Sequence, residues 1–82
     1  MRGNCAIWCA AVTLPGGATA EGRGASRRDA FQGALRALPD APPDAKAAAR
    51  RAFETLRGAR VGARTVRAEC HGAAVSLRRD CR

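Results

Sequence analysis

Near its N-terminus the chain has a mostly apolar stretch, residues 4–14, whose pattern does not fit a strand with one solvent-exposed face. Read as a β-strand, it places Trp8, Val12 and Leu14 on one face, because successive side chains point to opposite sides. The other face is also apolar and holds Cys5, Ile7, Cys9 and Ala11. A half-exposed antiparallel strand would alternate apolar with polar residues. The strand is therefore either central and covered on both sides, or one face is covered by a partner. For the face of Cys5, Ile7, Cys9 and Ala11, a small-residue surface that tolerates water and a dimer or partner surface both stay open.

The same stretch also has the outline of a short secretory signal. Arg2 precedes it, a Pro-Gly-Gly breaker follows it, and residues 18–20 read Ala-Thr-Ala, which fits a cleavage site. The stretch is weakly hydrophobic, however, because it contains Thr13 and two cysteines. We therefore expect residues 1–20 to be retained in a cytoplasmic protein; the alternative is export after cleavage near Ala20. No run reaches the ~18 apolar residues of a membrane span, so we expect no membrane partner.

Two amphipathic helices are predicted in the middle of the chain. Ser26 begins a capping-box-like Ser-Arg-Arg-Asp sequence. Apolar residues then recur at helical spacing until Pro39 ends the first helix. The second helix has Pro43 near its first position and Gly58 just past its end, which is the asymmetry expected of helix termini.

Strands are predicted on both sides of the helices. A return strand over residues 18–23 follows the Pro-Gly-Gly turn. Apolar and polar residues alternate over residues 65–71 and again over 75–78, with a turn at Gly72 and a break near residues 64–65. The order is β-β-α-α-β-β. An antiparallel sheet with both helices on one face satisfies it best, which predicts an α+β fold in a single domain over residues 1–82.

Alanine dominates the apolar composition. The chain has twenty Ala but one Trp, two Phe and no Tyr. Because alanine buries little area, we expect the large side chains to supply most of the hydrophobic stabilisation. The expected core residues are Ile7, Trp8, Leu14, Phe31, Leu35, Leu38, Phe53, Leu56, Val66, Val75 and Leu77.

The net charge of +8 is unevenly distributed. Residues 1–41 carry five basic and three acidic side chains, whereas residues 42–82 carry ten and four. Arginine makes bidentate contacts with phosphate and carboxylate groups, although GC-rich coding also raises arginine and alanine together. We expect a partner-binding surface formed by Lys46, Arg50, Arg51, Arg57, Arg60, Arg64 and Arg67. Arg27 and Arg28 form a candidate anion site at the start of the first helix.

The cysteines and the histidine form no recognisable catalytic or metal motif. Cys5 and Cys9 have metal-knuckle spacing, but an extended strand separates them by about 13 Å. Cys70 and His71 would point to opposite faces of a strand. We expect free thiols, no metal, no cofactor and no enzymatic activity; in an exported protein the alternative is a Cys70–Cys81 disulfide.

Binding functions remain. We expect an inhibitor or adaptor that acts through its arginine-rich surface on an acidic protein or nucleoprotein complex. Small phage and mobile-element proteins, including inhibitors of CRISPR effectors, are similar in size and lack of motifs, an analogy that rests on no residue pattern. The alternative is a DNA- or RNA-binding module that contacts phosphates without sequence preference, although aromatic residues for base stacking are missing. A second alternative is a small exported protein with disulfide bonds.

Overall fold

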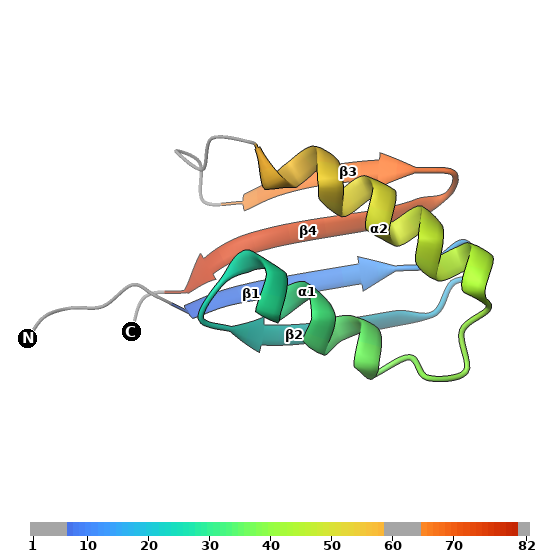
Figure 1. Cartoon of the computed structure of the whole chain (residues 1–82), viewed down its shortest axis with the longest axis horizontal. Helices are drawn as coiled ribbons and strands as arrows, with labels where there is room; N and C mark the ends of the chain where they lie inside the picture. Colours follow the sequence, from blue (N-terminus) through green and yellow to red (C-terminus); the bar gives the residue numbers. More distant parts are fainter. Residues whose placement is uncertain (1–6, 59–64, 81–82) are drawn as a thin grey trace, which may run out of the picture.

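The strands nearest the two ends of the chain pair with each other in the middle of the sheet (Figure 1). A computed structural model describes residues 7–58 and 65–80. Its elements are β1 (Ile7–Thr13), β2 (Thr19–Gly24), α1 (Arg27–Arg36), α2 (Pro43–Arg57), β3 (Thr65–Cys70) and β4 (Ala73–Asp80). All neighbouring strands are antiparallel, in the order β2-β1-β4-β3. The predicted α+β fold and element order are confirmed.

Both hairpin turns use backbone conformations with positive φ. Gly17, in the turn between β1 and β2, has a φ of 98°. His71 and Gly72 form the two-residue turn between β3 and β4, with φ values of 49° and 85°. Positive φ at both central residues is typical of the hairpin turn that matches strand twist. His71 therefore belongs to the turn and not to the strand that the sequence predicted over residues 65–71.

The helix boundaries follow the predicted signals. Ser26 is the N-cap of α1, and its hydroxyl accepts a 3.1 Å hydrogen bond from the backbone N–H of Asp29. The helix ends at Arg36, before Pro39. Pro43 is the first residue of α2, and Gly58 follows its last residue. Among the described residues, no helix is long and apolar enough to cross a membrane.

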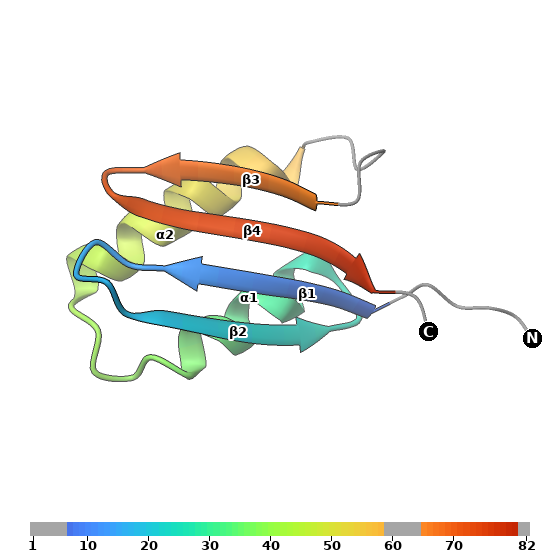
Figure 2. The same cartoon turned by 180° about the vertical axis from the view of Figure 1, so that it is seen from behind.

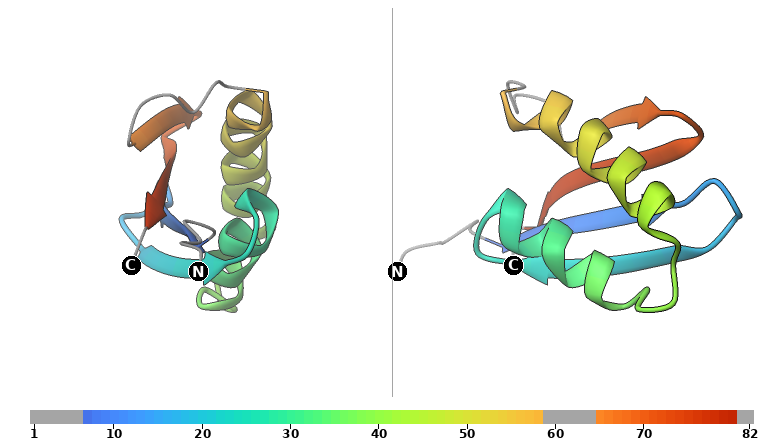
Figure 3. Two further views of the ribbon diagram at one scale, coloured as in Figure 1. Left: turned by 90° about the vertical axis from the view of Figure 1, so that its left-hand side faces the viewer. Right: turned by 45° about the vertical axis from the view of Figure 1, so that its right-hand side comes forward.

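The two helices cover one face of the sheet, so the molecule has two layers (Figure 3). α1 packs mainly on β2 and β1, while α2 packs on β3 and β4. Gly22 and Gly24 allow α1 to lie directly on the backbone of β2: a Cβ atom on Gly22 would lie 2.3 Å from the carbonyl oxygen of Ala30. These glycines match no phosphate-binding motif, and close helix packing accounts for both of them.

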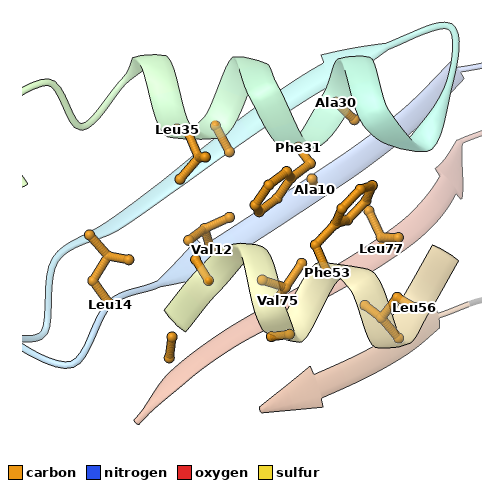
Figure 4. Close-up of a cluster of buried hydrophobic side chains, with 14 of the residues drawn as sticks. Ala10, Val12, Leu14, Ala30, Phe31, Leu35, Phe53, Leu56, Val75 and Leu77 are labelled. Atoms are coloured by element: carbon orange, nitrogen blue, oxygen red, sulfur yellow. The ribbon is translucent and has the colours of Figure 1, made fainter. Parts of the chain in front are cut away.

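The core lies between the sheet and the helices (Figure 4). Val12, Val75 and Leu77 are its largest fully buried side chains. Seven of the fifteen buried residues are alanines, so small residues form much of the core beside the larger side chains. The prediction that Ile7 is buried was wrong, since its exposed fraction is 44%. Val12 was absent from the predicted set, and three predicted residues are only partly buried: Trp8, Leu38 and Val66.

Candidate binding groove between the two helices

The two helices run antiparallel and are held apart by a pair of aromatic rings. Phe31 of α1 and Phe53 of α2 point toward each other and stack, with ring centroids 4.3 Å apart and planes within 1° (Figure 4). Both rings are buried. The helices otherwise touch each other little, because each packs mainly on the sheet. A groove therefore runs between α1 and α2 above the stacked rings.

Arg27 of α1 links the two helices at one end of the groove through hydrogen bonds to the end of α2. Its Nη1 donates hydrogen bonds of 2.7 Å to the carbonyl of Leu56 and 3.0 Å to that of Arg57. These carbonyls lie in the last turn of α2, where the usual partners four residues further along are lacking; the Leu56 carbonyl also accepts from the backbone N–H of Gly58. The Arg27 guanidinium also lies over the Trp8 ring, 5.1 Å from its centroid. Arg27 thus ties the start of α1 to the end of α2, and the six residues between the helices join them at the other end.

The groove has a volume of about 490 Å³, an apolar floor and a largely cationic rim. We call it the cationic groove. Phe31, Leu35 and Phe53 form the floor. The rim consists of Arg28, Gln32, Arg36, Lys46, Arg50, Glu54 and Arg57.

Positive charge dominates the rim, with five cations against one carboxylate. Glu54 is engaged by Arg57, whose Nη1 lies 3.1 Å from a carboxylate oxygen. This exposed pair contributes at most ~1 kcal/mol. The other four cations, Arg28, Arg36, Lys46 and Arg50, form no side-chain hydrogen bond or ion pair with other residues that the structure describes. The groove therefore presents several uncompensated charges to solvent.

The structure divides the predicted partner-binding surface. Lys46, Arg50 and Arg57 lie on the cationic groove. Arg51, on the same helix, lines a different hollow. Arg67 extends from β3 on the side away from the helices, where its Nη2 lies 2.9 Å from Glu69. Two further predicted residues, Arg60 and Arg64, lie outside the described residues.

Helix α1 contributes groove residues that the sequence-based prediction placed in a different site or did not identify. Arg28 was paired with Arg27 as a candidate anion site, but only Arg28 lines the groove, and Arg27 is engaged with the end of α2. Arg36 was not singled out. Arg28, Gln32 and Arg36 recur every four residues, a spacing that places them on one helix face. That spacing was the available signal.

The second face of β1 is the uncovered face of the sheet (Figure 2). Ile7 and Ala11 are exposed there and Cys9 is half-buried, while Cys5 lies outside the described residues. Cys9 stands between Arg23 of β2 and Arg78 of β4 in the strand register. This face is thus small and apolar at its centre and flanked by arginines, and its role as a dimer or partner surface stays a prediction.

The described cysteines do not assemble a reactive or metal-binding site. Cys9 and Cys70 are free thiols, and Cys9 lies on the uncovered face while Cys70 packs against the core. Cys70 pairs with Ala73 at the turn end of its hairpin, and Cys81 lies outside the described residues. Among the residues described, no three His, Cys, Asp or Glu side chains gather where they could hold a metal ion.

No protein-family model, curated protein or solved structure matches this chain. The side chains of the groove are therefore the basis for assigning a function.

Proposed function

We propose that this protein is a non-enzymatic binding protein that holds an acidic partner in the cationic groove. The observation that carries this proposal is the convergence of five cations from two helices on one groove, four of them without a described side-chain partner. The partner is an acidic surface of a protein or nucleoprotein complex. The protein acts on it as an inhibitor or adaptor, in the manner of a phage or mobile-element accessory protein in the cytoplasm.

The positions of two of these cations support the proposal. Arg28 lies in the first turn of α1 and Lys46 is the fourth residue of α2. A positive side chain there opposes the helix dipole, at a cost of up to ~1 kcal/mol that Asp29 and Asp44 in the same first turns partly offset. A bound anion would reverse that cost, because helix N-termini and cationic side chains both attract negative charge. Carboxylate or phosphate groups of a partner would therefore relieve repulsion inside the groove.

The floor of the groove favours a protein partner over single-stranded nucleic acid. Proteins that bind single strands stack bases on accessible aromatic rings. Phe31 and Phe53 are buried and stacked on each other, so neither ring is available to a base. Phosphate contacts alone would support binding without sequence preference, and this is the second candidate function, favoured by the net charge of +8.

A pull-down separates the two candidates. The wild-type chain and the Arg36→Glu/Arg50→Glu variant would be used as bait in host lysate, with and without nuclease and at raised salt. We expect one stoichiometric acidic protein to be retained by the wild type after nuclease treatment and at moderate salt, and to be lost from the variant. Undiminished capture by the variant would refute the groove as the binding site. Capture that disappears with nuclease, or falls uniformly with salt, would favour phosphate binding.

A further inference from the structure

A second hollow lies on the other side of α2, where both hairpin turns meet the first half of that helix. Its volume is about 650 Å³. The turns approach closely, since a Cβ atom on Gly72 would lie 3.4 Å from the Cβ of Pro15. Most of its lining is apolar: Leu14, Pro15, Ala18, Ala41, Pro42, Ala45, Ala47 and Ala48. We call it the apolar hollow.

The first half of α2 contributes small apolar side chains to this hollow. Ala45, Ala47 and Ala48 line it, whereas the second half of the helix carries the larger Phe53 and Leu56 into the core. Small-molecule sites typically have volumes of about 300–1,000 Å³, mainly apolar walls and a few polar groups. The apolar hollow, at about 650 Å³, lies within that range.

Three polar side chains line the apolar hollow: Asp44, Arg51 and His71. None of them forms a side-chain hydrogen bond or ion pair with another described residue. Asp44 and Arg51 are seven residues apart on one helix, which separates them by about 10 Å along its axis. Their charges therefore lie at different ends of the hollow and leave Arg51 available to a ligand.

The position of His71 adds to the case. It occupies the first central position of the hairpin turn with a φ of 49°, where Asn, Asp or Gly is usual. Histidine is one of the few residues other than glycine that are enriched at such positive φ values, and His71 lines the hollow. The turn thus places an imidazole at the hollow.

We propose that the apolar hollow binds a small organic carboxylate with an apolar body. The apolar body lies against Leu14, Pro15 and the alanines of α2. The carboxylate lies at the Arg51 end, where a planar guanidinium can accept it in a bidentate contact, with His71 as a further polar partner. The net charge of +8 favours an anion over a cation of the same shape. This site is independent of the cationic groove.

Binding can be tested with anilinonaphthalene sulfonate, an apolar fluorescent anion, and with decanoate as competitor. Ala47→Phe fills the hollow from an exposed position, and Arg51→Gln removes its cation. Thr55→Phe, on the same helix, and Arg67→Gln, on β3, are the controls, because neither residue lines the hollow or the cationic groove. Thermal unfolding with and without decanoate gives a second readout that does not depend on the dye.

We expect the wild type and both controls to bind the dye and to release it to decanoate, with a rise in melting temperature. Ala47→Phe should abolish binding and Arg51→Gln should weaken it about tenfold. Decanol, which lacks the carboxylate, should compete at least tenfold more weakly. The proposal is overturned if the wild type binds neither dye nor decanoate, or if Ala47→Phe binds as well as the wild type. Equal competition by decanol, or a dimer that closes the hollow, would also overturn it.

Discussion

The two sides of α2 present opposite chemistry to solvent. On the side facing α1, Lys46, Arg50 and Arg57 border the cationic groove. On the side facing the hairpin turns, Ala45 and Ala48 border the apolar hollow. Arg50 and Arg51 are neighbours in sequence, yet they belong to different surfaces. Charge density along a sequence therefore does not define a binding surface; the direction of each side chain from the helix does.

The difference arises from the side chains that separate α2 from its neighbours. Beside the groove, the stacked Phe31 and Phe53 rings support both helices and close the floor. Beside the hollow, α2 contributes mainly alanines. Both features open to solvent: the groove lies above stacked rings, whereas small residues form most of the apolar hollow. The following substitutions test the packing that supports the groove.

Removing one ring of the stack should have the largest effect. Phe53→Ala leaves a cavity under the groove and removes the support between the helices. We expect a loss of about 3–5 kcal/mol in the free energy of unfolding, measured by urea denaturation. Arg50→Ala, on the same helix but exposed, is the control and should change stability by less than ~0.5 kcal/mol. Similar stability of Phe53→Ala and wild type would show that the stack does not support the groove.

The close packing of α1 on β2 should have the next largest effect on the free energy of unfolding. In Gly22→Val, the new side chain would meet the backbone of Ala30 and Ala34, and α1 must move away from the sheet. We expect a cost of about 1–3 kcal/mol from overpacking. Gly58→Ala provides a control, since nothing lies within 4 Å of its added Cβ atom. Equal urea midpoints for the two variants would contradict the close helix–strand contact.

The Arg27 contact should have a smaller effect. Arg27→Met keeps much of the side-chain volume but removes the donors to the carbonyls of Leu56 and Arg57. Because the site is only partly buried, we expect a loss of about 1–2 kcal/mol. Arg28→Met, the adjacent position without such contacts, should be close to neutral. If the two variants unfold at the same denaturant concentration, Arg27 does not fasten the end of the groove.

The sequence was most informative about local structure. Ser26, Pro43 and Gly58 mark helix ends through backbone hydrogen bonding and fixed dihedral angles, which act within a few residues, and all three were read correctly. The exposure of Ile7 could not be read in this way. Both faces of β1 are apolar, and the helices cover only one of them.

The candidate site was only partly predictable for a related reason. The alternation of β3 already placed Arg67 with the outward residues of that strand, so its separation from α2 was readable. The sequence could not predict that Arg36 and Arg50 line the same groove, because this depends on how α1 and α2 lie across the sheet. The apolar hollow is an absence of large side chains at one end of α2, and no local motif marks such a gap.

The most direct test of the cationic groove compares Arg50→Glu with Arg51→Glu. The substitutions make the same charge change at adjacent positions of one helix, so overall charge and helix propensity are matched. The probe is a fluorescein-labelled oligoglutamate peptide, with binding followed by fluorescence anisotropy at fixed moderate salt. We expect Arg50→Glu to raise the Kd about tenfold or more, which corresponds to ~1.4 kcal/mol, and Arg51→Glu to raise it less than threefold. Equal weakening by the two substitutions would show that the peptide responds only to net charge, and would contradict the groove as a binding site.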